Sequence, residues 1–543
     1  MRALLSSRRI WVLVTILLTF SHCNLLLDWG DDRPGVCGDG VREGGETCDG
    51  TDLGGATCDG LAYTAGALAC RADCTIDPAG CTTCGDGEAE GDEACDIEDL
   101  RDVTCQSEGY YGGQAACSEF CELVLTDCLT YGRCGDGIIQ DESGDVCDGG
   151  NLGETGCSDL EHWGGQLACN DHCNQYLVEN CSRVASIGAG AAHTCLTDTQ
   201  GIPYCWGGDD HGQAGGGASA RVTSPVQLDV IDCGGSVRVS AGFDVTCGLC
   251  DDTYVLRCWG DNSAGQLGLG DTADREVPTV IPPPSSVVWL RVAVGADHLC
   301  GIAGTGDVWC AGGNASGQLG TGDQTGVDAF SPVDGPADPG FGSIAAGVGF
   351  TCAVDNEGAP WCWGRGDRGQ IGDGATQGRL APTAVTVSGG VTFGGVMAGD
   401  DHACALDTAG NAWCWGAGDR GQLGNGQLSD ATAPVAVHMP PATVFYDLVC
   451  GGRSCCGLDS SGRVFCWGAN DAAQLGIGAG PDRSEPIQAL LPGGTVVTAL
   501  AVGGAHVCVL TLEETVWCWG QGGDGQLGQG DTLPSPTPVR VIP

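Results

Sequence analysis

A pair of cysteines recurs seven times along the C-terminal two thirds of this chain. The first cysteines of successive pairs lie 52 or 53 residues apart, and the two members of a pair are ten or eleven positions apart. A fixed period of about 50 residues, divided among several short strands, is typical of a β-propeller. The repeats therefore predict an all-β fold with a seven-bladed β-propeller over residues 184–543. The pairs are Cys195 with Cys205, Cys247 with Cys258, Cys300 with Cys310, Cys352 with Cys362, Cys404 with Cys414, Cys456 with Cys466, and Cys508 with Cys518.

Each cysteine pair flanks a short polar turn, of which Asp198–Gly201 is the first example. Alternating apolar residues, as in Val237–Ser240, precede the first cysteine and predict a strand. A strand led by proline, such as Pro225–Leu228, ends each repeat. A turn between two cysteines makes their strands antiparallel neighbours, so the pair faces across a hairpin. We therefore predict one cross-strand disulfide in each blade.

The two ends of the repeat region predict how the ring closes. Val184–Ile187 reads as a strand, and the proline-led segment Pro538–Val541 reads as another. In a closed ring the last strand lies beside the first, and we expect the two to complete a shared blade. Closure of this kind removes free sheet edges, which otherwise promote aggregation.

Two motifs follow the first cysteine of each repeat: Cys-Trp-Gly, and Gly-Gln-Leu-Gly as in Gly265–Gly268, Gly317–Gly320, Gly421–Gly424 and Gly525–Gly528, with variants in the other three repeats. With these motifs, residues 184–543 resemble the repeats of the regulator of chromosome condensation family. The resemblance implies a seven-bladed propeller. It does not imply one function, because a fold of this kind hosts many.

Histidines stand two positions before the first cysteine in alternate repeats, where Val245, Phe350 and Ser454 occupy the remaining places. A ring of histidines around a central channel could bind a metal ion. We favour the alternative, a buried position at which imidazole bonds neighbouring backbone, because apolar residues interrupt the ring. The histidines are His193, His298, His402 and His506.

The tryptophan of Cys-Trp-Gly recurs in six repeats and is replaced by Ala311 in the third. Recurrence at one position indicates packing rather than a sugar-stacking site. We expect the glutamine of the second motif to bond loop backbone within each blade. The tryptophans are Trp206, Trp259, Trp363, Trp415, Trp467 and Trp519, and the glutamines are Gln213, Gln266, Gln318, Gln370, Gln422, Gln474 and Gln526.

Upstream, eighteen cysteines form three blocks of six, which predict modules at residues 37–83, 84–133 and 134–183. The cysteine spacing is almost the same in all three. A module of about 50 residues with few large apolar side chains cannot bury enough surface to fold unaided, so we expect three disulfides in each. The sequence does not choose among the 15 pairings of six cysteines. A zinc cluster fits the spacing less well.

These blocks resemble the myxococcal-type cysteine-rich repeats, which implies a structural or surface-display role. Each opens on Cys-Gly-Asp-Gly, and carboxylates recur around the second cysteine. Such oxygen ligands could hold calcium. We favour turns in which aspartate accepts backbone N–H bonds, because the spacing does not match an EF-hand loop. The residues are Asp39, Glu46, Asp49, Asp86, Glu93, Asp96, Asp136, Asp145 and Asp148.

The N-terminus predicts export. Arg2, Arg8 and Arg9 precede the apolar run Ile10–Phe20, which is too short to span a bilayer comfortably. The run ends at a Ser-His-Cys sequence that resembles the lipobox of bacterial lipoproteins, which implies that Cys23 is lipidated. The paired arginines also resemble a twin-arginine signal, but that route exports proteins folded in a reducing cytoplasm, and the cysteine content argues against it.

Cysteine parity supports a special role for Cys23. The chain has 37 cysteines, and without Cys23 the remaining number is even. Four cysteines stand outside the repeats, and we expect them to pair as Cys233 with Cys250 and Cys450 with Cys455. The predicted organisation is thus a signal peptide of lipoprotein type at 1–23, a linker at 24–36, three modules and the propeller.

Charge and motifs narrow the function. The formal net charge is −48 and the chain has no lysine, so phosphate backbones would be repelled and we expect no nucleic-acid partner. No nucleophile elbow, histidine metal motif or phosphate loop is present. We therefore expect a monomer without catalytic, cofactor-binding or metal-binding residues, which contacts a membrane only through an N-terminal lipid.

We interpret the chain as an exported interaction protein of the cell envelope, either lipid-anchored or secreted. The modules would form a stalk, and the propeller would bind a protein through loops such as Asp271–Pro284 and Asp323–Gly340. The alternative is an inhibitor or regulator of an extracellular enzyme, a role known for one propeller of this repeat family. The family name also implies nucleotide exchange on a small GTPase, but disulfides and export place the chain in another compartment. A glycan-active enzyme is disfavoured because no separate acid/base pair is evident.

Overall fold

The computed structural model describes residues 37–542, with gaps at 39–41, 43, 62, 64, 83–86, 90–93, 98, 119, 161, 216, 218–220, 229–236, 285–286 and 336–339. The chain divides into two compact units, Met1–Ile138 and Ile139–Pro543. The predicted signal peptide, the linker and the predicted lipidation site Cys23 lie outside the described residues. Among the described residues, no helix has the length and apolarity needed to cross a membrane.

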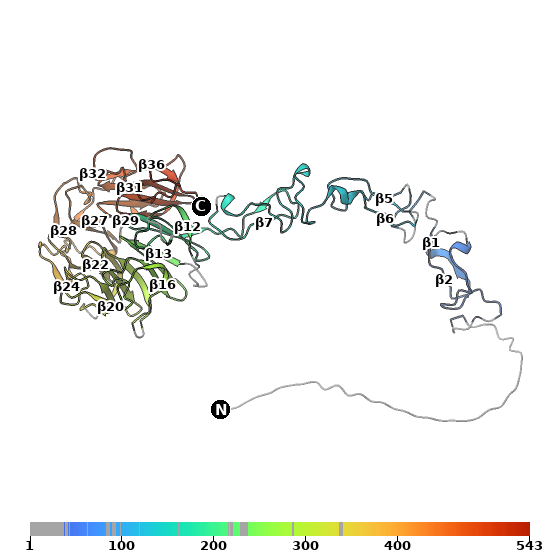
Figure 1. Cartoon of the computed structure of the whole chain (residues 1–543), viewed down its shortest axis with the longest axis horizontal. Helices are drawn as coiled ribbons and strands as arrows, with labels where there is room; N and C mark the ends of the chain where they lie inside the picture. Colours follow the sequence, from blue (N-terminus) through green and yellow to red (C-terminus); the bar gives the residue numbers. More distant parts are fainter. Residues whose placement is uncertain are drawn as a thin grey trace, which may run out of the picture. The chain divides into compact units, whose positions relative to one another are not determined.

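The second unit contains seven four-stranded antiparallel sheets, arranged as blades around a common centre (Figure 1). Four consecutive strands build each blade, and we name them A to D from the innermost to the outermost. Strands A line the central channel, and strands B are almost entirely buried because they lie between two neighbours within the ring. The predicted all-β, seven-bladed fold is confirmed.

The strands of blades 1 to 3 are β9 (Val184–Ala189), β10 (His193–Asp198), β11 (Pro203–Gly208) and β12 (Arg221–Gln227); β13 (Val237–Gly242), β14 (Val245–Cys250), β15 (Leu256–Gly260) and β16 (Arg275–Val280); and β17 (Trp289–Val294), β18 (His298–Ala303), β19 (Val308–Gly312) and β20 (Val327–Pro332). Blades 4 and 5 consist of β21 (Phe341–Ala346), β22 (Phe350–Asp355), β23 (Pro360–Gly364) and β24 (Arg379–Ala384); and β25 (Phe393–Ala398), β26 (His402–Asp407), β27 (Ala412–Gly416) and β28 (Ala431–Ala436). Blades 6 and 7 consist of β29 (Phe445–Gly451), β30 (Ser454–Asp459), β31 (Val464–Gly468) and β32 (Arg483–Gln488); and β33 (Val497–Val502), β34 (His506–Thr511), β35 (Val516–Gly520) and β36 (Ser535–Arg540).

The ring closes differently from the prediction. β9 to β12 form the first blade and β33 to β36 form the last, so each blade comes from a single repeat and the predicted shared blade is wrong. The two blades meet through their faces instead. β33 packs against β9, and the backbone nitrogen of Gly504 lies 3.2 Å from the carbonyl oxygens of Gly190 and Ala191. Because each repeat already supplies four strands, none is left to be exchanged.

The predicted cysteine partners of the seven repeats are bonded in the structure. In each blade the two cysteines lie directly opposite each other on strands B and C, with Cα atoms 4.0 to 4.1 Å apart. The bonded pairs are Cys195 with Cys205, Cys247 with Cys258, Cys300 with Cys310, Cys352 with Cys362, Cys404 with Cys414, Cys456 with Cys466, and Cys508 with Cys518.

Two further disulfides were predicted outside the repeated pairs. Blade 6 contains the first of them, in which Cys450 of strand A is bonded to Cys455 of strand B, with Cα atoms 4.1 Å apart. For the second, Cys250 is disulfide-bonded, and its predicted partner Cys233 lies outside the described residues. The pairing in blade 6 is therefore confirmed, and the pairing of Cys250 with Cys233 stays a prediction.

The cysteine-rich modules contain only short elements. These are η1 (Asp59–Leu61), β1 (Ala65–Gly66), β2 (Ala69–Cys70), β3 (Ile76–Asp77), η2 (Pro78–Gly80), β4 (Cys81–Thr82), β5 (Ala116–Cys117), β6 (Leu123–Val124), η3 (Cys128–Tyr131), η4 (Asp141–Ser143), η5 (Ser158–Leu160), β7 (Ala168–Cys169) and β8 (Tyr176–Leu177).

The structure selects one of the pairings that the sequence left open. The first module joins its first cysteine to its fifth, its second to its fourth and its third to its sixth, as Cys37–Cys74, Cys48–Cys70 and Cys58–Cys81. The second and third modules repeat the last two of these pairings, with Cys95–Cys117, Cys105–Cys128, Cys147–Cys169 and Cys157–Cys181.

Candidate functional site

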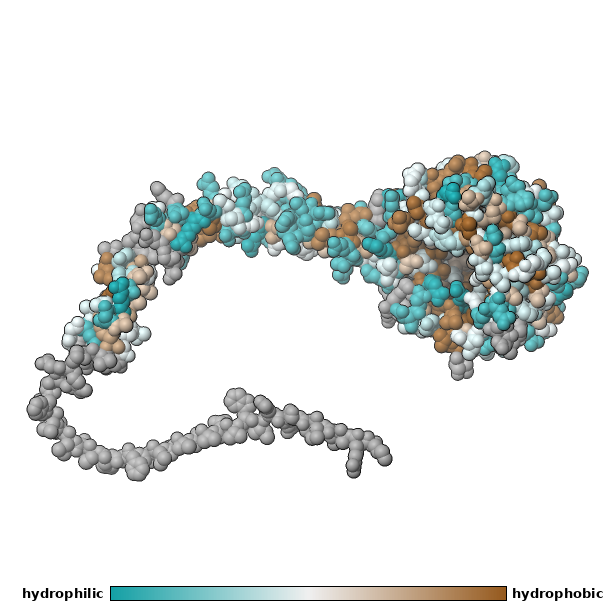
Figure 2. Space-filling view, turned by 180° about the vertical axis from the view of Figure 1, so that it is seen from behind, coloured by the Kyte–Doolittle hydropathy of each residue, from teal (hydrophilic) through white to brown (hydrophobic). Residues whose placement is uncertain are grey.

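The propeller has two faces with different loops. Neighbouring strands of a blade are antiparallel, so the A–B and C–D loops lie at one end of the blades, and the B–C turns and the connections from strand D to the next strand A lie at the other. We call the first the loop face and the second the hairpin face. Separate hydrophobic patches lie among hydrophilic residues on the side of the propeller seen in Figure 2.

On the loop face, the repeated glutamines fix the C–D loops. The side-chain oxygen of each accepts the backbone N–H two residues upstream, at 2.7 to 3.0 Å. Their amide nitrogens donate to aspartates in six of the seven cases, as from Gln266 to Asp261 at 2.7 Å. The predicted bonding of loop backbone within each blade is confirmed.

The six repeated tryptophans are fully buried, which confirms the packing interpretation. Five of them donate from Nε1 to the main-chain oxygen of the motif glutamine in the preceding blade, at 2.9 to 3.0 Å. The bond from Trp206 to Gln526 crosses from blade 1 to blade 7 and so helps to close the ring. Glutamine and tryptophan therefore have structural roles, one within a blade and one between blades.

The four repeated histidines are also fully buried, as predicted. Their Nε2 atoms contact the following blade: His193 reaches Thr246 Oγ1 at 2.8 Å, and His298 reaches Thr351 Oγ1 at 2.9 Å. His506 lies 2.8 Å from Thr194 Oγ1 and His402 lies 3.1 Å from Cys455 Sγ. We predicted that these imidazoles bond neighbouring backbone. For Nε2 this is wrong, because its partner is a side-chain hydroxyl or sulfur of the next blade.

The threonines fix the protonation of these histidines. Thr246 and Thr351 donate their hydroxyls to the main-chain oxygens of Gln213 and Gln318, at 3.0 and 2.9 Å. Each hydroxyl therefore accepts from the imidazole Nε2–H. Burial lowers the pKa of His193 to about 3 and the pKa values of His402 and His506 to about 4. These imidazoles are neutral at physiological pH.

Donor and acceptor alternate around the ring. In blades 3, 5 and 7 the residue after the histidine is apolar (Leu299, Ala403 and Val507). In blades 2, 4 and 6, which lack the histidine, the corresponding residue is the acceptor Thr246, Thr351 or Cys455. Seven blades cannot alternate perfectly, and blade 1 carries both His193 and Thr194. The histidines thus form four separate contacts between blades instead of one metal-binding ring.

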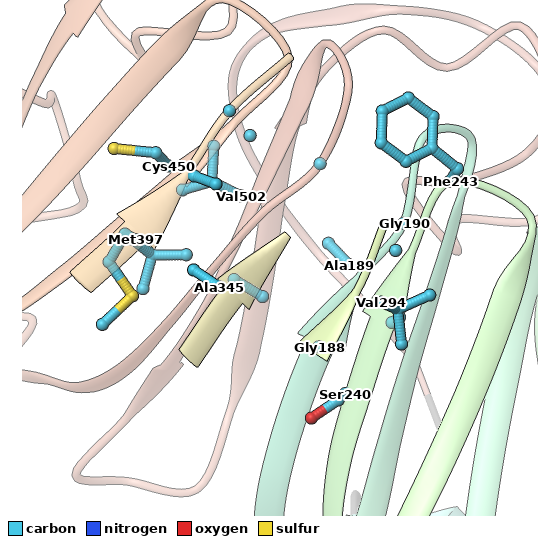
Figure 3. Close-up of a pocket in the computed structure, with 18 of the residues that line it drawn as sticks. Gly188, Ala189, Gly190, Ser240, Phe243, Val294, Ala345, Met397, Cys450 and Val502 are labelled. Atoms are coloured by element: carbon cyan, nitrogen blue, oxygen red, sulfur yellow. The ribbon is translucent and has the colours of Figure 1, made fainter. Parts of the chain in front are cut away.

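The central channel is small, and most of its side chains are apolar. It has a volume of about 360 Å³ and is lined by the seven innermost strands, with small residues such as Gly188, Ala189, Val294 and Ala345 (Figure 3). Asp400 is the one acidic or basic residue among the described residues that line it. Burial raises the pKa of Asp400. Asp400 has no second carboxyl group or imidazole beside it among the described residues that line the channel.

Many charged side chains of the loop face bond one another across blades. Arg368 of blade 4 contacts Asp430 of blade 5 at 2.5 Å, and Arg420 of blade 5 contacts Asp471 of blade 6 at 3.2 Å. His211 takes the corresponding place in blade 1, where its Nδ1 lies 2.9 Å from Asp274 of blade 2. This bond raises the pKa of His211. These charges connect neighbouring blades and are engaged within the propeller.

On the hairpin face, the third module packs against blades 1 and 7 within the second unit. Trp163 is 3% exposed and joins the core of the first blade, where its ring lies 6.1 Å from Trp206 and 5.5 Å from Tyr204. Arg183 forms an ion pair with Glu514 at 3.2 Å. This packing covers part of the hairpin face.

Further around the same face, two adjoining cavities lie over blades 4 to 6. One has a volume of about 520 Å³ and the other about 300 Å³, and they share Gly394 and Thr408. Tyr446 and Val444 line the larger cavity, and their side chains are 56% and 52% exposed. We call the two cavities the Tyr446 groove. Sequence reasoning missed this groove, since a pair of glycines in a strand is not by itself a binding signal.

The repeated carboxylates of the modules accept backbone N–H bonds. Asp49 accepts from Gly38 at 2.8 Å and Asp96 from Gly87 at 3.1 Å, while Asp145 accepts from Gln140 at 3.3 Å. These bonds support the turn interpretation over calcium. Asp39, Asp86 and Glu93 lie outside the described residues.

These features define a repeat propeller whose recurring polar side chains hold the blades together. The chain belongs to the RCC1-like family, since the RCC1-like domain matches residues 258–543. It is 31% identical to the ultraviolet-B receptor UVR8 of Arabidopsis thaliana over 353 residues, which are 65% of this chain and 80% of that protein. It is 28% identical to the human regulator of chromosome condensation over 62% of this chain and 85% of the relative.

Among solved structures, the chain is similar to yeast RCC1 (Prp20) in its complex with Kap60. The TM-score is 0.56 with 19% sequence identity, and the likeness covers 66% of this chain and 84% of the yeast chain. At this level of identity the likeness bears on the fold alone.

Proposed function

We propose that this chain is an exported interaction protein that binds a protein partner through the hairpin face of its propeller. The observation that carries the proposal is the Tyr446 groove, where exposed Val444 and Tyr446 border an open cavity. Exposed apolar side chains beside a cavity are typical of interaction sites. On the loop face, by contrast, Arg368 and Arg420 are engaged by aspartates of the next blade.

Proteins with a similar fold are described with protein partners. Yeast RCC1 is described in a complex with Kap60, and the yeast protein Prp20p is described with binding properties to Gsp1p and histones. The partner of this chain is of another kind, because its disulfides are typical of an oxidising compartment. The arginine-rich N-terminus and the apolar run before Cys23 support export to the cell envelope, with either a lipid anchor at Cys23 or release.

Site-specific photo-crosslinking tests the proposal. A crosslinker replaces Val444 on the hairpin face or, as a matched control, Leu428 on the loop face, which is 64% exposed. We expect the Val444 position to capture one envelope protein in the producing cell, and the Leu428 position to capture none. Capture from Leu428 alone, or from neither position, contradicts the proposal. If the captured protein is an enzyme that the chain inhibits, the partner is an inhibition target.

Mass spectrometry of the N-terminal peptide tests the export route. We expect a cleaved chain that begins at Cys23 and carries a lipid. An unmodified Cys23 in a cleaved chain supports release from the cell instead, and an uncleaved N-terminus contradicts export.

A further inference from the structure

The floor of the Tyr446 groove is made by two consecutive glycines of strand β25. Gly394 and Gly395 follow Phe393 at the hairpin end of strand A in blade 5. A Cβ atom added at Gly394 would have no heavy atom within 4 Å, so the fold does not require glycine here. Blades 3 and 6 carry Leu290 and Tyr446 at the corresponding position. The groove is therefore open because blade 5 omits a side chain that the repeat can accommodate.

A half-buried carboxylate, Asp447, lines this groove. Its Oδ1 accepts the N–H of the adjacent Leu448 at 2.9 Å. Among the ion pairs between described residues, none includes Asp447, whereas nearby Asp459 is paired with Arg463. Burial raises the pKa of Asp447. Partial burial makes the charged form of such a carboxylate less stable, and a cation that binds beside it restores that stability.

An exposed aromatic ring lies next to this carboxylate. Tyr446 is 56% exposed, and both residues line the larger cavity. The Tyr446 hydroxyl donates to the main-chain oxygen of Thr498 in blade 7 at 3.5 Å, so the ring lies along the rim of the cavity on its blade 7 side. An aromatic face attracts a cation, and the attraction increases when the cation is partly removed from water. The other carboxylate of the larger cavity, Asp407, already accepts the N–H groups of Ala409 and Asn411 and the Nε1–H of Trp413. Within the larger cavity, Asp447 is therefore the carboxylate that can still take a positively charged partner.

We propose that the Tyr446 groove binds a single arginine or lysine side chain of the protein partner, with Asp447 as its counter-ion and Tyr446 against its aliphatic stem or charged head. The proposal rests on the proposed function and specifies the chemistry of the partner. Two copies of the chain, each with a net charge of −48, repel one another, so a second copy is a poor source of the cation. A basic protein surface is complementary to it.

Short blocked peptides test this directly on the full mature chain. Each peptide contains Gly and Ser around one central residue, which is arginine, lysine or norleucine, and binding is measured by saturation-transfer NMR and calorimetry. We expect the arginine and lysine peptides to bind and the norleucine peptide to bind at least about tenfold more weakly, as for the loss of a charge-assisted bond. Equal binding of all three overturns the proposal.

Two variants locate the binding. Asp447→Asn removes the charge, and Gly394→Leu fills the groove with the residue that blade 3 already carries at the corresponding position. We expect each substitution to lower the affinity for the arginine peptide at least about tenfold, while the unfolding temperature stays close to that of the parent chain. The matched control Asp307→Asn removes an exposed hairpin-face charge in blade 3, and binding should be unchanged.

The outcomes separate this proposal from the proposed function. If Asp307→Asn weakens binding of the arginine peptide as much as Asp447→Asn does, the attraction is a general effect of negative charge, and the proposed site is wrong. A neutral sugar that binds the groove and tolerates Asp447→Asn also overturns it, because the site is then a saccharide site. If the Val444 crosslink to a partner persists in the Gly394→Leu chain, the protein interaction stands and the arginine or lysine pocket fails. If the peptides bind but Val444 captures no partner, the pocket stands and the proposed function fails.

Discussion

In the first module, disulfides join cysteines 22 to 37 positions apart, whereas in the blades they join strands that already face each other across a hairpin. The cores of the two regions differ as well. Among the described residues of 37–181, the buried apolar side chains are cysteines apart from Tyr110 and Trp163. The propeller instead buries tryptophans, leucines and valines between its blades.

This difference teaches that one covalent bond has two roles in the same chain. In the modules the disulfides make up most of the core, because few other apolar side chains are buried. In the propeller they reinforce hairpins that packing and backbone bonds already hold in place. The two regions should therefore respond in opposite ways to reductant and to acid.

Reduction should have the largest effect, and it should act on the modules. We expect modules 1 and 2 to unfold completely in dithiothreitol while the propeller keeps its native fold, because only the modules lack a core without their disulfides. Limited proteolysis followed by mass spectrometry measures this, with cleavage expected between residues 37 and 133. Simultaneous unfolding of the propeller would show that its disulfides are as essential as those of the modules.

Acid should act on the propeller instead. His193, His402 and His506 have folded-state pKa values of about 3 to 4, below the ordinary value of about 6.5. Between these values the unfolded chain binds more protons, so the free energy of unfolding decreases as pH falls. For three such histidines, the free energy of unfolding should fall by about 4 kcal/mol for each pH unit between pH 6 and about 4.5. Denaturant unfolding at several pH values measures it, and the triple variant to Gln should show a flatter profile.

Trp163→Ala should loosen the packing of the third module on the propeller. The loss of a buried aromatic side chain costs about 3–5 kcal/mol, and here it removes contacts with Tyr204 and Trp206. Hydrogen exchange in residues 139–183 should increase, with less change in blades 3 to 5. Phe120→Ala, at a side chain that is 67% exposed, is the control. An equal response to both substitutions would mean that the packing of Trp163 contributes little.

The smallest change in stability is expected when the disulfide between Cys450 and Cys455 in blade 6 is replaced by alanine and threonine, which other blades carry at these two positions. Cys450→Ala with Cys455→Thr removes a cross-link worth about 2 kcal/mol. The new threonine hydroxyl can accept from His402 and donate to a main-chain oxygen of the preceding blade, as Thr246 and Thr351 do. Each of these two hydrogen bonds contributes about 1 kcal/mol to the free energy of unfolding. The free energy of unfolding should therefore change by about 1 kcal/mol or less. Cys450→Ala with Cys455→Ala lacks the hydroxyl and should be clearly less stable, and equal stability of the two variants would show that the hydroxyl is not used.

The sequence predicted the fold and the cysteine pairs because both are periodic. A 52-residue period and a turn between paired cysteines, such as Cys195 and Cys205, are local signals, and they place strands B and C without knowledge of the other blades. The closure was predicted wrongly, because a strand pattern does not show whether its neighbour comes from the same repeat. The module pairings were open for a similar reason, since spacing alone does not define proximity in space.

The partners of the histidines could have been found from the sequence. Each Nε2 partner lies 53 residues after its histidine, or on the return from blade 7 to blade 1. Apolar residues and threonine or cysteine alternate after the histidine position, and this alternation is visible in the repeats. The Tyr446 groove could not have been found in this way. It depends on the absence of a side chain at Gly394 and on the surroundings of Asp447 in the fold, and neither leaves a pattern.

The alternation of histidine and threonine restricts how this ring can gain or lose blades. If blade 2 were deleted alone, His193 would face Leu299 and a buried imidazole would lose its acceptor. If blades 2 and 3 were deleted together, His193 would face Thr351 and the match would be restored. Side chains in the core of blades 2 to 7 therefore encode a parity: loss of blade 2, 4 or 6 alone creates a buried mismatch, and loss of the next blade with it restores the match. Blade 1 is the exception, because it carries both His193 and Thr194 and its loss would leave His506 facing Thr246.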